Sequence, residues 1–244
     1  MSETGALFYD NPEVFNIYQE RREQNSSANQ TLEWPIIQEW LTQRSYPQVL
    51  DLGCGDATIA PWLLKQGTQY YQGIDGSARM IELASTLHSP QIRLQQGYIE
   101  NWEYPETGTF DLVLSRLAFH YIEDIQPVFQ KIFQALKPGG DFVFSVEHPV
   151  ITSNQLSMKQ GANRQDWVVD RYFQTGKRNV SWMGGQVLKY HRTVEDYYQS
   201  LKNNGFVVQD LRESCPKATH IKDKKLFEKR SRIPLFLLLS AHKP

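Results

Sequence analysis

The chain has 244 residues, of which 40% are apolar and 12% aromatic, with 26 basic and 27 acidic side chains. This length suits one or two domains with a buried core. The near-neutral charge argues against a general nucleic-acid binder, and two cysteines, Cys54 and Cys215, argue against a secreted disulfide scaffold. The most apolar stretch, Leu235–Leu239, is far shorter than the about 18 residues of a membrane span. With no signal-peptide pattern at the N-terminus, we expect a cytoplasmic protein that contacts neither membrane nor nucleic acid.

The first two elements predicted along the chain are helices. Asn11 can cap a helix that has Pro12 in its first turn. Apolar residues then recur at helical spacing over Leu32–Leu41.

From residue 49 onward, short apolar runs alternate with helical periods. A helix with Leu63 inward follows the first run, Ser77 can cap a second helix, and Ile125–Leu136 has a clear helical period. The apolar runs predict strands at Val49–Leu52, Tyr70–Ile74, Ile92–Gln95, Phe110–Leu114 and Phe142–Val146. Strands and helices in alternation predict a doubly wound α/β fold with a parallel sheet.

The last third of the chain departs from this rhythm. Residues 149–190 are polar and rich in Gly and Asn, with scattered aromatic side chains and no predicted element. Thr193 then begins a helix with a capping-box pattern, and we expect Tyr197, Tyr198 and Leu201 to face inward. Two final strands are predicted at Phe206–Leu211 and Leu235–Ala241. The stretch between them, Lys217–Arg232, holds seven basic side chains; it could contact an anionic substrate or RNA, but we interpret it as a solvated helix face.

A glycine-rich turn follows the first predicted strand. In VLDLGCGDATIA, Asp51 ends the strand, and Gly53 and Gly55 allow a tight turn that a ligand can approach. The next helix offers free N–H groups to polar groups of that ligand. Asp75 ends the second strand, where a carboxylate can accept both hydroxyl protons of a ribose. A dinucleotide fingerprint would have a third glycine at Thr58, so this pattern disfavours a nucleotide-linked oxidoreductase.

The turn resembles the first motif of the S-adenosylmethionine-dependent methyltransferases with the Rossmann-like fold. The similarity extends through IDGSARM (74–80), FDLVLSRLAFHYIED (110–124) and LKPGGDFVFSVEHP (136–149), and the order and spacing match over residues 45–148. It implies a mostly parallel seven-stranded sheet with helices on both faces and an antiparallel last strand. It also implies one domain comprising an N-terminal helical lid (1–44), a cofactor-binding core (45–148), a substrate-cap insertion (149–192) and a C-terminal helix with a strand hairpin (193–244).

The resemblance implies S-adenosylmethionine as cofactor and assigns roles to residues that match the family's motifs. Gly53 and Gly55 would face the methionine part, Asp51 would orient the turn or receive the amino group through water, Asp75 would bind the ribose, and Met80 would lie near the adenine. The full set of expected cofactor-binding residues is Asp51, Gly53, Cys54, Gly55, Asp75, Gly76, Met80, Tyr98, Ile99 and, through its carbonyl, Ser115. The sequence departs from the family pattern at Ala57, the third glycine position, and at Tyr98, where the family often has Asp.

Methyl transfer is an in-line displacement, and it needs a base only if the acceptor arrives protonated. His120 is the best-placed candidate for that base, because it follows the fourth strand. Tyr18 and Arg22 lie where related enzymes have a lid, and the aromatic insertion suggests a partly apolar or planar acceptor. The expected substrate-contacting residues are Tyr18, Arg22, His148, Trp182 and His191.

Several chemistries are disfavoured by missing patterns. The six histidines are scattered and no cysteine pair is present, so we expect no metal site. Enzymes that methylate amino groups of nucleic acids or of glutamine keep an Asn/Asp-Pro-Pro-aromatic sequence after the fourth strand, and this chain has none there. It also has no Pro-Cys nucleophile suited to cytosine C5. We therefore expect an S-adenosylmethionine-dependent methyltransferase that acts on a small molecule, as a monomer or homodimer. The alternatives are a non-catalytic S-adenosylmethionine-binding protein and an RNA methyltransferase, and the methylated atom (O, N or C) stays open.

Overall fold

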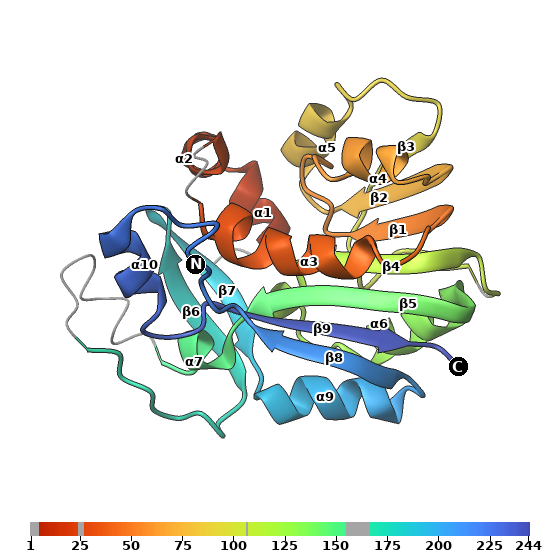
Figure 1. Ribbon diagram of the computed structural model, residues 1–244. Helices are drawn as coiled ribbons and strands as arrows, with labels where there is room; N and C mark the ends of the chain where they lie inside the picture. The colour runs from red at the N-terminus through yellow and green to blue at the C-terminus, as the bar shows by residue number, and fades with distance from the viewer. Residues whose placement is uncertain (1–4, 24–26, 106, 155–165) are drawn as a thin grey trace.

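The computed structural model describes residues 5–23, 27–105, 107–154 and 166–244 (Figure 1). Its largest element is a seven-stranded sheet in the order β3-β2-β1-β4-β5-β9-β8. The strands of this sheet are β1 (Gln48–Leu52), β2 (Tyr70–Asp75), β3 (Ile92–Gln96), β4 (Phe110–Arg116), β5 (Leu136–Glu147), β8 (Val207–Glu213) and β9 (Phe236–His242).

The direction of the strands confirms the predicted sheet. Strands β1 to β5 pair in parallel, and β9 runs antiparallel to both of its neighbours, β5 and β8. The strand order reverses at β1, which has β2 on one side and β4 on the other. In open α/β sheets, ligands bind beyond the carboxyl ends of the strands at such a reversal. The topology therefore indicates a binding site at the ends of β1 and β4.

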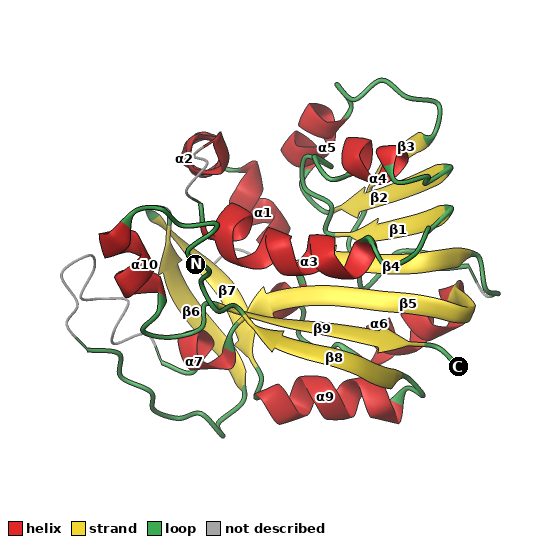
Figure 2. Ribbon diagram, in the orientation of Figure 1, coloured by secondary structure: helices red, strands yellow, loops and turns green. Residues whose placement is uncertain are grey.

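Helices cover both faces of the sheet (Figure 2). One face packs on α6 and α9, and the other on α3 and α4. The helical elements are α1 (Gly5–Asp10), α2 (Pro12–Glu23), the π-helical turn η1 (Asn29–Glu33), α3 (Trp34–Leu41), α4 (Ala60–Lys65), α5 (Ala78–Ala84), the 3₁₀ turn η2 (Phe119–Tyr121), α6 (Gln126–Ala135), α7 (Pro149–Thr152), α9 (Val194–Asn203) and α10 (Lys224–Arg230).

Alternation along the central strands supplies both halves of the core. In β4, Val113 lies in the cluster with α6, whereas Leu112 and Leu114 lie in the cluster with α3. Successive side chains of a strand point to opposite faces, so a strand with helices on both sides is apolar throughout. This is why the centre of β4, Leu112–Leu114, is a continuous apolar run in the sequence.

Three predicted helix caps are present. Asn11 accepts hydrogen bonds from the N–H groups of Glu13 and Val14, and Ser77 accepts from Met80. Thr193 forms a capping box at the start of α9. In that helix, however, the expectation that Tyr198 faces inward is wrong, since its side chain is 37% exposed.

The described parts of the insertion, 149–154 and 166–192, contain more regular structure than the sequence suggests. They begin with α7 and include a two-stranded hairpin formed by β6 (Gly176–Trp182) and β7 (Gly185–His191). Helix α1 packs against β7, where Phe8 lies so close to Gly185 that a Cβ there would be 2.7 Å from its ring. In Figure 1 the hairpin lies beyond the ends of β5, β8 and β9. The insertion and the N-terminal helices thus meet over one edge of the sheet.

Within the described ranges, no helix is both long enough and apolar enough to cross a membrane.

Candidate active site

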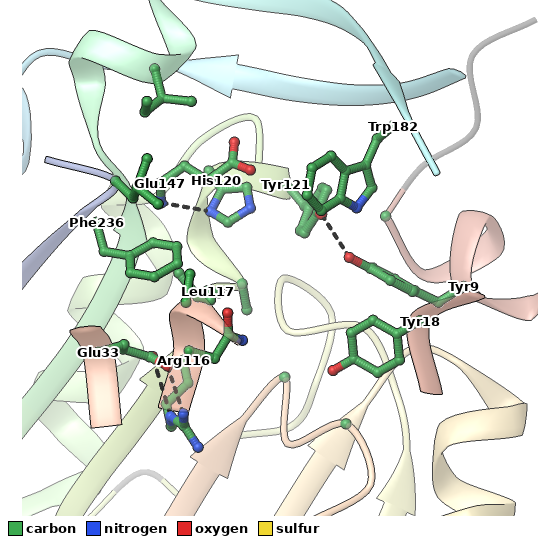
Figure 3. Close-up of a pocket in the computed structure, with 18 of the residues that line it drawn as sticks. Tyr9, Tyr18, Glu33, Arg116, Leu117, His120, Tyr121, Glu147, Trp182 and Phe236 are labelled. Carbon is green, nitrogen blue, oxygen red and sulfur yellow. Dashed lines mark hydrogen bonds and ion pairs between the residues drawn. The ribbon is translucent and has the colours of Figure 1, made fainter. Parts of the chain in front are cut away.

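A large cavity lies at the carboxyl ends of the parallel strands. Its volume is about 1200 Å³, and it is lined by the turn after β1 and by the last residues of β2, β4 and β5, namely Asp75, Arg116 and Glu147. Side chains from α1, the hairpin and the segment before β9 complete the wall (Figure 3). The cavity therefore occupies the place at which the topology indicates a ligand.

The glycine turn is held against the end of β2. The N–H groups of Gly53 and Cys54 both donate to the carbonyl oxygen of Ile74, at 2.8 and 3.0 Å. Gly53 has φ +73°, and a Cβ at this position would lie 2.5 Å from the Cβ of Ala118. Only glycine fits this close approach of the turn to the loop after β4. Gly55 and Ala57 also have positive φ, a backbone conformation that glycine adopts more readily than alanine.

Asp51 offers a buried carboxylate oxygen to the cavity. Its Oδ2 accepts a hydrogen bond from the Tyr71 hydroxyl at 2.6 Å, whereas Oδ1 has no hydrogen-bond partner among the described residues. Burial raises the pKa of Asp51 to about 6. A buried carboxylate with an unsatisfied oxygen is strongly stabilised by a cationic donor. The methionine ammonium group of S-adenosylmethionine is such a donor, and Asp51 therefore fits that cofactor.

Asp75 is positioned by backbone groups on both sides. Its Oδ2 accepts from the N–H of Gly55 at 2.8 Å, and its Oδ1 accepts from the N–H of Ser77 at 2.9 Å. Burial raises the pKa of Asp75, and these two hydrogen bonds oppose that effect. Each carboxylate oxygen has two lone pairs, so each keeps capacity for a further hydrogen bond. This geometry suits acceptance from the two hydroxyl groups of a ribose.

The other expected cofactor residues divide into those that line the cavity and one that does not. Cys54, Gly76, Met80, Tyr98 and Ile99 line it together with the glycine turn. Met80 is buried and Tyr98 is 44% exposed. Burial raises the pKa of the Cys54 thiol, so this cysteine is an inert wall residue.

Ser115 lies outside the cavity lining. Its hydroxyl is fully buried and donates to the carbonyl oxygen of Leu52 at 2.7 Å. The next two residues, Arg116 and Leu117, line the cavity instead. Neighbouring residues of a strand point to opposite faces, and the end of β4 therefore presents Arg116 rather than the Ser115 side chain.

Arg116 belongs to a cluster of hydrogen-bonded polar side chains that the sequence pattern did not predict. Its guanidinium forms a bidentate ion pair with Glu33 of η1, at 3.2 and 2.6 Å, and the Glu33 carboxylate is fully buried. The Ser145 hydroxyl donates to the same carboxylate and accepts from the N–H of Leu117. Leu117 has φ +56°. This network fixes the loop after β4 at the edge of the cavity.

His120 lines the cavity, but its surroundings are unlike those of a general base. Its Nδ1 accepts a hydrogen bond from the N–H of Glu147 at 3.3 Å, which places the ring proton on Nε2. Burial lowers the pKa of His120 to about 3. The only basic lone pair of the neutral ring is therefore occupied, and the ring acts as a hydrogen-bond donor at Nε2.

The expected substrate residues are only partly brought together. Tyr18 and Trp182 line the cavity. His148 instead caps α7 through Nδ1, and its Nε2 lies 2.9 Å from the Glu213 carboxylate. His191 is fully buried between the Thr152 hydroxyl and the Tyr172 carbonyl oxygen. Neither histidine lines this cavity, and the side chain of Arg22 lies outside the described part of the chain.

Two further side-chain pairs lie near the end of the cavity beyond β5, where Tyr9, Tyr121 and Glu147 belong to the lining. The Tyr9 and Tyr121 hydroxyls lie 3.1 Å apart, and burial raises the pKa of both phenols (Figure 3). Lys189, only 1% exposed, lies 2.6 Å from Glu147. Burial raises the pKa of Glu147, but the adjacent Lys189 ammonium outweighs this and holds the pKa below its usual range. A lysine within the polar insertion gives no sequence signal of burial.

Helix α1 packs against the start of α5, beside the expected cofactor residues. The Asp10 carboxylate accepts from the Ser77 hydroxyl at 2.6 Å, and its carbonyl oxygen accepts from Arg79 Nε at 2.8 Å. A Cβ on Gly76 would lie 2.6 Å from the Cβ of Ala6. The first helix therefore lies directly over the start of α5.

Among the residues that the structure describes, no group of three or more His, Cys, Asp or Glu side chains could hold a metal ion.

Known proteins share both the sequence pattern and the fold. The profile of the methyltransferase domain family matches residues 49–140. A crystal structure of an S-adenosylmethionine-dependent methyltransferase from Mesorhizobium loti is 33% identical, covers 89% of this chain and 99% of its own, and superposes with a TM-score of 0.78. An uncharacterised protein of Haemophilus influenzae is 30% identical over 216 residues, 84% of this chain and 85% of the relative.

A further relative matches a smaller part of the chain. The trans-aconitate 2-methyltransferase of Deinococcus radiodurans is 32% identical over 114 residues, 46% of this chain and 42% of the relative. The glycine turn, the carboxylates at the ends of β1 and β2, and the strand order agree with these similarities. The chain belongs to the S-adenosylmethionine-dependent methyltransferases, and S-adenosylmethionine is its cofactor.

Proposed function

We propose that this methyltransferase transfers the methyl group in line to a small molecule bound in the same cavity. The main support is the size and enclosure of that cavity. A pocket for one ligand typically measures about 300–1,000 Å³. At about 1200 Å³, this cavity has room for a second small molecule beside the cofactor.

The two ends of the cavity differ in character. The ends of β1 and β2 supply Asp51 and Asp75, which suit the ammonium and ribose groups of S-adenosylmethionine. When bound, that cofactor supplies an electrophilic methyl group on a sulfonium sulfur. The opposite end lies over β5 and the start of β9 and includes Tyr121, Trp182 and Phe236. Aromatic walls of this kind exclude water and orient a small acceptor.

The closing elements favour a small acceptor over a macromolecule. Helix α1 packs on both β7 and α5, so it spans the side of the cavity that lies between them. Phe8, Val14, Val180 and Val187 form a buried cluster between the N-terminal helices and the hairpin. A base of an RNA or a side chain of a protein substrate would have to pass this packed layer to reach the cavity. The trans-aconitate 2-methyltransferase relative, whose name states a small-molecule substrate, is in line with this proposal.

A labelled-methyl experiment tests the proposal. The protein is incubated with S-adenosylmethionine labelled in its methyl group and, separately, with a low-molecular-weight cell filtrate, total RNA or total protein. We expect label in a small molecule from the filtrate. Label in RNA or protein alone would reject the proposal, and absence of transfer to all three would favour the non-catalytic alternative. Thermal unfolding with S-adenosylhomocysteine confirms ligand binding in the same sample: at about 100 times its dissociation constant, a ligand stabilises by about 2.7 kcal/mol.

A further inference from the structure

His120 and Glu147 form a pair of polar side chains on one wall of the cavity. His120 belongs to η2, which follows β4, and Glu147 is the last residue of β5. Both line the cavity, and the N–H of Glu147 donates to His120 Nδ1, which holds the ring against the end of β5 (Figure 3). The part of the cavity beyond the tips of β4 and β5 is called the acceptor end below.

His120 presents a hydrogen-bond donor to the cavity. The residue is only 2% exposed, and burial lowers its pKa to about 3, so the ring is neutral. Because Nδ1 accepts from a backbone N–H, the ring proton is on Nε2. No described residue accepts a hydrogen bond from Nε2, and this atom is not sealed within the core. His120 Nε2 is therefore a donor that a ligand can use.

Glu147 presents a hydrogen-bond acceptor beside this donor. Its Oε1 accepts from Lys189 Nζ at 2.6 Å, and Lys189 lies behind the wall, outside the cavity lining. Burial raises the pKa of Glu147, but the Lys189 ammonium outweighs this effect, so the carboxylate stays ionised. The buried phenols of Tyr9 and Tyr121, whose pKa values are raised, are neutral. No described residue donates to Glu147 Oε2, which is therefore an anionic acceptor open to the cavity.

The other described carboxylates that line the acceptor end already have partners on both oxygens. Both oxygens of Glu33 accept from the Arg116 guanidinium. Glu123 has Oε1 3.2 Å from Lys177 Nζ, and its Oε2 accepts from the Tyr190 hydroxyl. Glu147 is thus the carboxylate at this end that is best placed to bond to a ligand.

The pair of His120 and Glu147 lies beside the expected methionine part of the cofactor. In the sheet, β4 and β5 follow β1 on the side away from β2, which carries Asp75. The loop after β4 touches the glycine turn, since a Cβ on Gly53 would lie 2.5 Å from the Cβ of Ala118. Ala118 precedes His120 by two residues. A ligand held by His120 would therefore lie next to the methyl-bearing part of the cofactor rather than next to its ribose.

A hydroxyl group matches this donor and acceptor and keeps a lone pair for the methyl group. Its oxygen has two lone pairs and one hydrogen. One lone pair can accept from His120 Nε2, the hydrogen can bond to Glu147 Oε2, and the second lone pair is left as the nucleophile. A neutral amine has one lone pair, which the His120 donor would occupy. A carboxylate would be repelled by the charge of Glu147.

Resting on the proposed function, we propose that the acceptor is a neutral hydroxyl compound methylated on oxygen, with His120 donating to that oxygen and Glu147 taking its proton. An oxygen lone pair forms the new C–O bond as the methyl–sulfur bond breaks, and the electron pair of that bond stays on sulfur. The hydroxyl proton passes to Glu147 Oε2 and then to solvent. The products are a methyl ether, S-adenosylhomocysteine and a proton. The oxygen becomes far more acidic as it gains the methyl group, so a carboxylate of low pKa is a sufficient base.

The atom that carries the label tests this inference in the wild-type protein. The low-molecular-weight filtrate is incubated with cofactor labelled in its methyl carbon, and the product is examined by NMR and treated with mild alkali. We expect the chemical shift of a methyl on oxygen and an alkali-stable product, as an ether requires. A methyl on nitrogen, sulfur or carbon, or an alkali-labile ester, would overturn this inference and leave the proposed function standing. Label in macromolecules alone, or no transfer at all, would overturn the proposed function itself.

Glu147→Gln tests the proton transfer. The initial rate of ether formation in diluted filtrate, which is proportional to kcat/KM, should fall at least about a hundredfold near pH 7. Without the base, only the ionised acceptor reacts, so the variant's rate should rise about tenfold per pH unit between about pH 6 and 9. The wild-type rate should change little over this range. A variant with the wild-type profile at a lower rate would show a merely structural role and overturn the inference.

A double variant controls for folding. Glu147→Gln leaves the buried Lys189 ammonium without its partner, which destabilises the protein. Glu147→Gln with Lys189→Met removes both charges, and we expect the same steep pH profile from it. Calorimetry with S-adenosylhomocysteine should give the wild-type affinity in the double variant, because neither side chain is expected to contact the cofactor. A flat profile in the double variant would contradict the role of Glu147.

A matched pair of variants at position 120 tests the donor. His120→Asn keeps an acceptor near Nδ1 but has no donor at the position of Nε2, whereas His120→Gln can place an amide N–H there. We expect His120→Asn to lower kcat/KM at least about tenfold and His120→Gln to keep more of the activity. Equal losses in the two variants, or a greater loss in His120→Gln, would overturn the donor role of His120.

Discussion

Substituting Asp51 should move stability and cofactor affinity in opposite directions. In the unfolded chain an aspartate has a pKa of about 3.9, whereas burial raises the pKa of Asp51 to about 6 in the folded protein. A raised carboxyl pKa means that the folded state binds the proton more tightly. The stability linked to this proton is fully present below about pH 4 and is lost as the pH rises through about 6. Two pKa units correspond to about 3 kcal/mol.

Asp51→Asn removes this penalty at neutral pH. Its side-chain oxygen can still accept from the Tyr71 hydroxyl, but the group is no longer ionised. We expect the ligand-free variant to gain up to about 3 kcal/mol near pH 7.5, a rise of about 6–12 °C in the melting temperature of a chain this long. The affinity for S-adenosylhomocysteine should fall at least tenfold, about 1.4 kcal/mol, because the ammonium loses its anionic partner.

The assay is thermal unfolding at about pH 5 and pH 7.5, with and without S-adenosylhomocysteine. The gain in stability should be present at the higher pH and fall to about half, about 1.5 kcal/mol, at the lower one, because pH 5 lies between the unfolded pKa of about 3.9 and the folded pKa of about 6. Asp56→Asn is the matched control, since Asp56 lies in the same turn but does not line the cavity. An Asp51→Asn protein that keeps the full ligand-induced shift would refute the pairing with the ammonium group. A loss of stability at pH 7.5 would refute the reasoning from burial.

Three further predictions follow from the site. Asp75→Ala should weaken S-adenosylhomocysteine binding at least tenfold by calorimetry, about 1.4 kcal/mol, and Asp56→Ala should not; equal affinities would remove Asp75 from the site. His120→Asn, which keeps an acceptor for the Glu147 N–H, should leave the shape of the kcat/KM profile between about pH 6 and 9 unchanged; loss of an ionisation from that profile would restore His120 as a base. Arg116→Met should cost about 3–5 kcal/mol in urea unfolding, because it leaves the Glu33 carboxylate buried without its cation. Adding Glu33→Gln should recover most of that loss, and a further loss would contradict the argument.

The sheet and its caps could be predicted because their signals are local. The caps at Asn11, Ser77 and Thr193 each bond to backbone N–H groups no more than three residues away. The centres of β1 and β4, Val49–Leu50 and Leu112–Leu114, are buried on both faces and are therefore apolar. Such patterns do not depend on partners distant in the sequence.

The hairpin was not predicted because its strands are only partly buried. In β6, Val180 alone is buried, and polar or charged residues occupy most of the other positions. One side of such a strand is in contact with solvent, so alternation is weak and a polar composition resembles a loop. Burial here depends on α1, which is distant in the sequence. The inward face of β7, with Lys189 buried, depends on Glu147 in the same way.

The ends of the strands were located correctly, but the side chains facing the cavity were not all identified. The last residues of β4 and β5, Arg116 and Glu147, line the cavity, whereas His148, one position after Glu147, lies outside that lining. A one-residue error in a strand reverses the direction of the side chain. Asp51 and Asp75 escaped this error because the glycine turn between them fixes their positions.

Helix α1 touches both halves of the cavity at once. Asp10 bonds to the start of α5 beside the cofactor residues, while Tyr9 bonds to Tyr121, and Phe8 packs on the hairpin at the acceptor end. Opening either half disturbs contacts of the same short helix, so we expect exchange of the cofactor and of the proposed acceptor to be kinetically coupled.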